Sequence, residues 1–149
     1  MRAVPAAGRS PRNGDKEDET IDFQYTVSTR KTVAEAAEAV EKALAERKFS
    51  VLWKLDANEK LREKGVELQP RFLILEVCSA PRAKQVLETN VYMGYFLPCK
   101  VVVYDAGEGT RIGFPRPTMM AGVLGDDRLE GIAGEVEGIL TEAVDEAAD

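Results

Sequence analysis

Two cysteines are the residues of this sequence best suited to chemistry, because a thiolate is both a nucleophile and a ligand for soft metals. Cys78 follows the apolar run 71–77, and Cys99 precedes the apolar run 100–104. Each cysteine therefore lies where a predicted strand meets a turn. If the two strands run antiparallel side by side, the end of one lies beside the start of the next, and the two sulfurs come within bonding reach.

Residues beside the cysteines favour a binding pocket at this position. Ser79 and Pro81 are typical of a helix start, where free N–H groups attract a thiolate or a bound anion. Lys100 or Arg82 would add positive charge. Such a pocket could hold a soft metal, a sulfur-bearing ligand or a reversible disulfide. The predicted ligand-binding residues are Cys78, Ser79, Pro98 and Cys99.

The alternation of side chains along a strand supports a competing interpretation. Cys78 shares its parity with Ile74, whereas Cys99 shares its parity with Val101, so the two sulfurs point to opposite faces unless a bulge intervenes. Both cysteines would then be small buried hydrophobic residues, which is a common environment for free cysteine. Both interpretations stay open at the level of the sequence.

Composition excludes several classes of site. The chain contains no histidine, so a Ser-His-Asp or Cys-His relay cannot form, and the histidine-containing zinc sites are excluded. Two cysteines do not complete a structural zinc site, and the sequence specifies neither a metal site nor a cofactor. The 149 residues carry 20 basic and 26 acidic side chains, a formal charge of −6, which argues against nucleic acid as a partner.

The amino-terminal residues and the absence of long apolar runs indicate the cellular setting. Residues 1–20 mix proline, glycine and charged side chains, which predicts a flexible tail rather than a secretory signal. No apolar run approaches 18 residues, so we expect no membrane partner. A cytoplasmic protein follows as the expectation, with its cysteines as thiols at rest.

A single α+β domain is predicted over residues 21–149, because this length buries a core without disulfide or metal staples. Alternating apolar residues predict strands, and the glycine-rich turn 105–109 predicts that the last two form an antiparallel hairpin. The predicted strands are 21–28, 49–55, 71–78, 100–104 and 110–114.

Two longer helices should cover one face of this mainly antiparallel sheet of about five or six strands. Thr32 and Glu35 have the spacing of a capping box, and an apolar stripe continues to about residue 47. A second long amphipathic helix is predicted from Asp127 onward. A shorter helix is predicted with Asp56 or Asn58 as its cap, and another after Ser79, while the segment containing Pro115 and Pro117 is predicted only to end the sheet.

Two motifs around the cysteines resemble those of one known family. The segments Cys78-Ser79-Ala80-Pro81 and Leu97-Pro98-Cys99-Lys100, the second followed by a valine run, resemble the domain of unknown function 302 family. The likeness spans roughly residues 21–147. It implies a compact β-α-β4-α sheet, similar to the TATA-binding-protein-like arrangement, that tends to pair into homodimers. It implies no agreed activity.

The sheet face away from the helices should be apolar, so it needs a cover. We expect a homodimer in preference to an apolar ligand there. The residues predicted on this face are Leu52, Phe72, Ile74, Val102 and Tyr104. Trp53, which could stack on a ligand, is instead predicted to pack in the core by its place in an alternating strand.

The leading functional hypothesis is a dimeric module that binds or senses a small ligand or a soft metal through the two-cysteine pocket. The alternative is a thiol-dependent redox or sulfur-transfer enzyme that uses Cys78 and Cys99. Both hypotheses require the two cysteines to share one accessible pocket.

Overall fold

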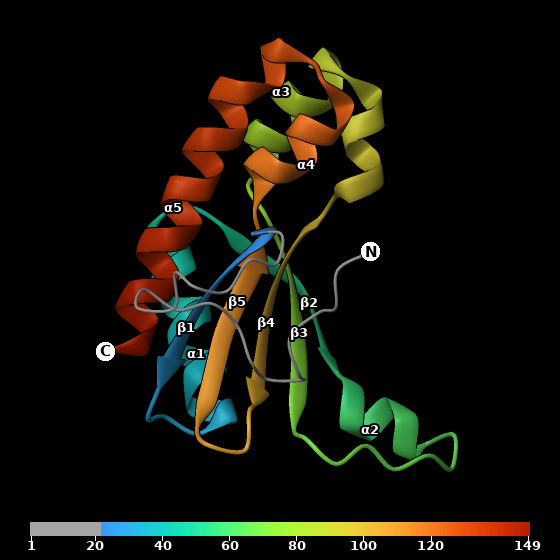
Figure 1. Cartoon of the computed structure of the whole chain (residues 1–149), viewed down its shortest axis with the longest axis vertical. Helices are drawn as coiled ribbons and strands as arrows, with labels where there is room; N and C mark the ends of the chain where they lie inside the picture. Colours follow the sequence, from blue (N-terminus) through green and yellow to red (C-terminus); the bar gives the residue numbers. More distant parts are fainter. Residues whose placement is uncertain (1–21) are drawn as a thin grey trace.

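The computed structural model describes residues 22–149, and the flexible tail predicted for 1–20 lies outside the described residues. Five antiparallel strands form one sheet in the order β1-β5-β4-β3-β2 (Figure 1). The predicted β3–β4 neighbours and the β4–β5 hairpin are confirmed. The strands are β1 (Gln24–Thr29), β2 (Ser50–Asp56), β3 (Phe72–Cys78), β4 (Cys99–Asp105) and β5 (Thr110–Pro115).

The two long helices, α1 (Val33–Glu46) and α5 (Glu130–Ala148), pack on one face of the sheet, as predicted. In Figure 1, α1 lies behind the strands, so the viewer looks at the face without helices. Alternate residues of β3 point toward the helices, and Leu75 is fully buried there. Val40 of α1 and Leu140 of α5 complete this core with no exposed surface.

Local sequence features determine where α1 begins and where the β4–β5 hairpin turns. The Thr32 hydroxyl accepts a hydrogen bond from the Glu35 amide at 3.1 Å, and the Thr32 amide donates to the Glu35 carboxylate at 2.9 Å. This capping box satisfies two donors that a helix start leaves free. In the hairpin, Gly107 and Gly109 adopt φ values of 88° and 127°, which side chains disfavour.

A β-bulge in β2 overturns the prediction for Trp53. The register places Val51 opposite Val77 but Trp53 opposite Glu76, so Leu52 is an extra residue in the strand. Because of this extra residue, the Trp53 side chain lies on the sheet face without helices instead of facing the core. Its side chain is 56% exposed, and the prediction that it packs in the core is wrong.

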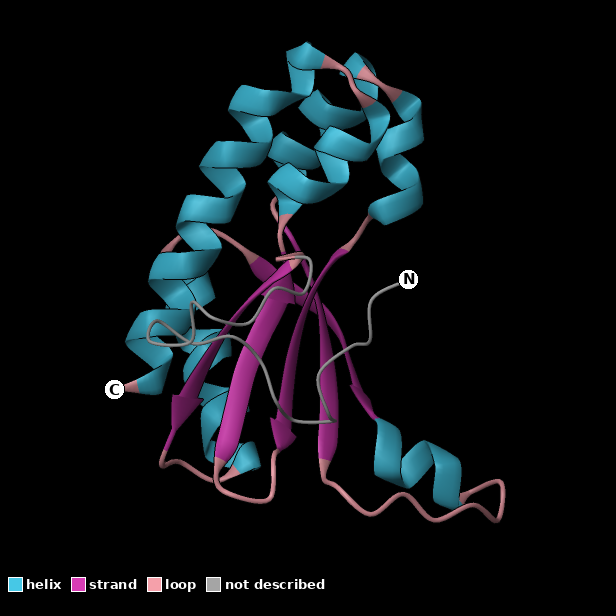
Figure 2. Cartoon of the chain, in the orientation of Figure 1, coloured by secondary structure: helices cyan, strands magenta, loops and turns pink. Residues whose placement is uncertain are grey.

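Helices beyond one end of the sheet form a layer that the sequence did not predict in full (Figure 2). The segment expected only to end the sheet forms α4 (Pro117–Leu124), with Pro117 in its first turn. It packs against η1 (Val91–Phe96) and α5, while α3 (Ala80–Thr89) packs against η1 and η2 (Asp127–Leu129). We call these elements the helical cap. Its own small core contains Val86, Met93, Ala121, Leu129 and Ala133.

A further short helix, α2 (Ala57–Arg62), lies at the opposite end of the sheet (Figure 1). Of the two predicted caps, Asp56 and Asn58, it is Asp56 that begins the helix, since its carboxylate accepts from the Glu59 amide at 3.1 Å. Among residues 22–149, no helix is both long and apolar enough to cross a membrane.

Candidate ligand pocket

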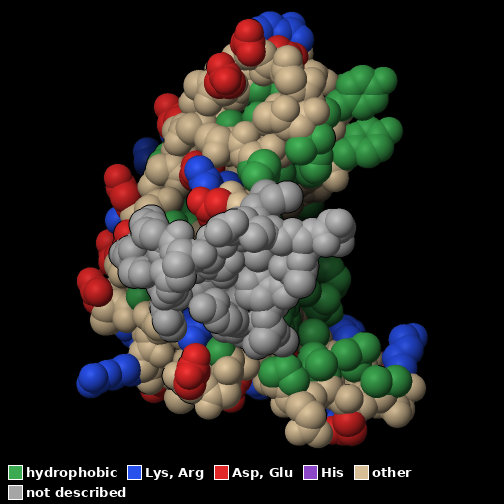
Figure 3. Space-filling model, viewed as in Figure 1, with side chains coloured by type: hydrophobic (Ala, Val, Ile, Leu, Met, Phe, Trp, Pro, Cys, Tyr) green, Lys and Arg blue, Asp and Glu red, His purple; other side chains and the backbone are tan. Residues whose placement is uncertain are grey.

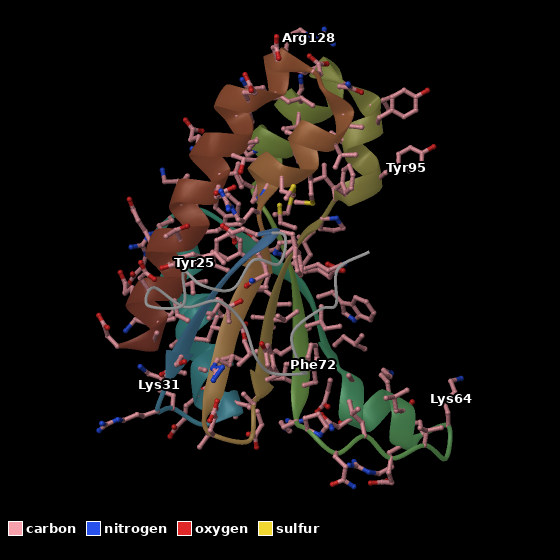
Figure 4. The ribbon with its side chains drawn as sticks, viewed as in Figure 1. Tyr25, Lys31, Lys64, Phe72, Tyr95 and Arg128 are labelled. Carbon is pink, nitrogen blue, oxygen red and sulfur yellow. The ribbon has the colours of Figure 1, made fainter. Side chains whose placement is uncertain are left out.

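A pocket of about 240 Å³ lies where the sheet meets the helical cap. Val77 and Cys99 line it from the ends of β3 and β4, while Val86 and Ala133 line it from α3 and α5. Figure 4 shows sulfur atoms, drawn in yellow, in this region between the strands and the cap helices. Nearly all the lining side chains are apolar. The pocket is therefore built by elements far apart in the sequence.

The antiparallel register explains why the predicted site residues meet at this position. β3 ends where β4 begins, and Val77 lies opposite Cys99. Ser79 then turns the chain into α3, while Pro98 leads from the cap into β4. All four predicted site residues, Cys78, Ser79, Pro98 and Cys99, contribute to the lining.

The two cysteines nevertheless do not form a pair. Both are free, half-buried thiols. Cys99 lies opposite Val77, whereas Cys78 lies opposite Ser50 on the other side of β3, and the β3–β4 register runs without a shift. Strand alternation therefore directs the two side chains to opposite faces. The prediction that their sulfurs lie within bonding reach is wrong, because no bulge corrects the parity.

Electrostatics also argue against a reactive thiol at Cys99. Burial raises the pKa of the Cys99 thiol to about 11, electrostatic interactions with Cys78 and Glu76 act in the same direction, and Lys100 opposes them. The thiol is thus protonated near neutral pH, and a protonated thiol is a poor nucleophile and metal ligand. Within the described part of the chain, no group of three or more His, Cys, Asp or Glu side chains is placed to hold a metal ion.

One end of the pocket is polar. Ser79 precedes α3 and is only 5% exposed, yet its side chain makes no capping hydrogen bond to that helix. Arg82 Nη1 lies 3.5 Å from Ser79 Oγ, and Arg82 Nε donates to Glu135 Oε1 at 2.7 Å. The guanidinium carbon is 5.9 Å from the centre of the Phe49 ring, which also lines the pocket.

Sequence reasoning missed most of the pocket wall. The apolar residues of α3 and α5 have the spacing of ordinary buried helix faces, and nothing in that spacing distinguishes a core from a pocket. Pro117 was the signal available for α4, since proline favours the first turn of a helix. The sequence prediction uses this proline only as the end of the sheet, and the helix that it begins is absent from that prediction.

A second candidate surface is the sheet face away from α1 and α5, which we call the open face. Phe72 and Tyr104 stack there with ring centres 5.2 Å apart and planes 14° apart. Leu52 and Trp53 are 59% and 56% exposed at the bulge. The apolar character predicted for this face is confirmed. Figure 3 also shows hydrophobic side chains protruding from the cap, where Tyr95 is labelled in Figure 4.

Comparisons with known proteins identify relatives without an assigned activity. The family model described as "Domain of unknown function DUF302" matches residues 24–147. The crystal structure of an uncharacterized conserved DUF302 protein from Bacillus stearothermophilus is 41% identical, with a TM-score of 0.81. That match covers 85% of this chain and 98% of the other. No curated protein is significantly similar to the chain.

Proposed function

The chain belongs to the DUF302 family, whose description names no activity, and we propose that it binds a small, largely apolar molecule in the pocket beneath the helical cap. The observation that carries this proposal is a preformed pocket whose lining is almost wholly apolar. Concave apolar sites with a few polar groups are the usual form of small-molecule sites.

The size of the pocket limits the ligand. Its volume of about 240 Å³ exceeds the roughly 150 Å³ of an engineered apolar cavity that binds benzene. A molecule somewhat larger than benzene would therefore fill it. Filling restores the dispersion contacts that the lining atoms lack when the space is empty. The cysteines would act as polarizable wall atoms rather than as reactive groups.

Toluene is a suitable first probe, because it matches the lining and carries no charge. We expect saturable shifts of amide NMR resonances in α3 and α5, centred on Val86 and Ala133, which line the pocket. A83F should weaken toluene binding at least tenfold, because the new ring occupies the pocket, and A80F is the matched control. Ala80 lies in the same helix but is exposed and outside the lining.

Two results would contradict the proposal. One is the absence of saturable shifts in the wild-type protein at millimolar toluene. The other is an unchanged toluene affinity in folded A83F, because a ligand held in this pocket must compete with the added ring.

We propose in addition that the open face pairs with a second copy of the chain. The support is the exposed apolar surface of Leu52 and Trp53, the stacked rings of Phe72 and Tyr104 further along the open face, and a charge pattern suited to two-fold pairing. Lys100 Nζ contacts Glu76 Oε2 at 3.0 Å on this face, so each subunit would offer both signs of charge to its partner.

Sedimentation at low micromolar concentration tests this pairing. Wild-type protein should sediment as a dimer and W53D as a monomer, because a buried unpaired charge opposes association. Y95D is the matched control, since Tyr95 is an 83% exposed aromatic residue on the cap, and this variant should stay dimeric. A monomeric wild-type protein, or a Y95D variant as monomeric as W53D, would exclude pairing through the open face.

A further inference from the structure

We infer that the ligand is a small carboxylic acid, with its apolar part inside the pocket and its carboxylate at Ser79 and Arg82. The inference rests on the proposed function and specifies the chemical class of the ligand. It follows from three features that residues 22–149 place at one end of the pocket: a buried hydroxyl whose proton has no acceptor, a helix start without a side-chain cap from Ser79, and the Arg82 guanidinium.

The Ser79 hydroxyl is the first feature. Ser79 is 5% exposed and lines the pocket. Its oxygen receives only the long 3.5 Å contact from Arg82, and its proton has no acceptor among residues 22–149. A buried hydroxyl without an acceptor is unfavourable, because it has given up its hydrogen bond to water without gaining a replacement. An oxygen atom of a ligand at the pocket end would satisfy it.

The amino terminus of α3 is the second feature. The side chain of Ser79, its N-cap residue, makes no capping hydrogen bond to this ten-residue helix, and the first turn contains no acidic residue. Helix starts leave backbone N–H groups without partners and carry partial positive charge. α1, by contrast, has a complete capping box. The start of α3 thus retains the capacity to bind an anion beside the Ser79 hydroxyl.

Arg82 is the third feature and the only charged side chain that residues 22–149 contribute to the pocket lining. Its Nε is bonded to Glu135, but a guanidinium has five N–H donors, so its terminal nitrogens retain donors for a further acceptor. A planar carboxylate suits such a fork. A doubly charged phosphate suits this site less. Residues 22–149 contribute one cation, Arg82, to the lining, and Glu135 already balances part of its charge.

Hexanoate and hexanamide are a matched pair of probes, because they differ mainly in charge. Calorimetry at pH 7 and low salt should show hexanoate binding at least tenfold more tightly than hexanamide. In R82M, the affinity for hexanoate should fall close to that for hexanamide. The affinity for hexanamide should stay within about twofold of its wild-type value. S79A should weaken hexanoate binding severalfold. Because this substitution removes only one oxygen atom, S79A still tests the inference if R82M folds poorly.

E135Q supplies the converse test. Removing the carboxylate that competes for Arg82 should tighten hexanoate binding and leave hexanamide unchanged. Equal affinities of the two probes, or full hexanoate affinity in both R82M and S79A, would overturn the inference while the proposed function stands. If neither probe binds and toluene also fails to bind, the proposed function itself is excluded.

Discussion

Replacement of Asn58 by alanine is expected to lower the free energy of unfolding by about 2–4 kcal/mol. Asn58 is 7% exposed in α2. Its Nδ2 donates to the carbonyls of Leu68 and Pro70 at 3.1 and 2.8 Å, and its Oδ1 accepts from the Phe72 amide at 2.7 Å. One side chain thus ties the loop after α2 to the start of β3. Alanine would leave three backbone groups without this partner.

Urea unfolding followed by circular dichroism measures the effect, and K60A is the matched control. Lys60 lies two residues further along α2, and its side chain is 58% exposed. Its substitution should change stability by less than about 0.5 kcal/mol. If N58A were as stable as K60A, water would be replacing the three hydrogen bonds, and Asn58 would not hold the loop.

Leu75→Ala should destabilise the protein by about 2–5 kcal/mol, because it leaves a cavity in the centre of the core. Leu75 lies in β3 between β2 and β4 and has no exposed surface. For a domain of this size, the loss lowers the melting temperature by roughly 10 °C. Differential scanning calorimetry measures both quantities.

Leu52→Ala is the matched control for the core substitution, since it removes the same atoms from a residue that is 59% exposed at the bulge. It should change the unfolding free energy of the separate subunit by less than about 0.5 kcal/mol. The comparison is made at a concentration below that needed for association. Similar losses in the two variants would show that burial does not account for the stability of this sheet.

Local chemistry made much of the fold predictable. The capping box of Thr32 and Glu35 and the alternation in β3 act within a few residues of the chain, so the sequence displays them directly. The four predicted site residues also line one pocket, because β3 and β4 pair antiparallel, as assumed from the sequence, and so place the end of one strand beside the start of the other. Family resemblance added the overall topology.

Other features depend on contacts that no local pattern records. Trp53 has the alternation of a core residue, and only the pairing of β2 with β3 reveals the bulge that exposes it. Val86 and Ala133 carry the same apolar signal whether they meet another side chain or an empty space. Whether their side chains border a pocket depends on how the cap packs against the end of the sheet.

The sequence by itself determined the type of most elements, the parity of Cys78 and Cys99, and the absence of any histidine-based chemistry. Only the tertiary structure decided that these cysteines stay unpaired, that α4 completes a helical cap, and that Arg82 lies beside Ser79 at an apolar pocket. The physical reason is the distance along the chain over which each interaction acts. Capping and alternation are fixed by neighbours along the chain, whereas register, burial and pocket shape are fixed by the packing of distant segments.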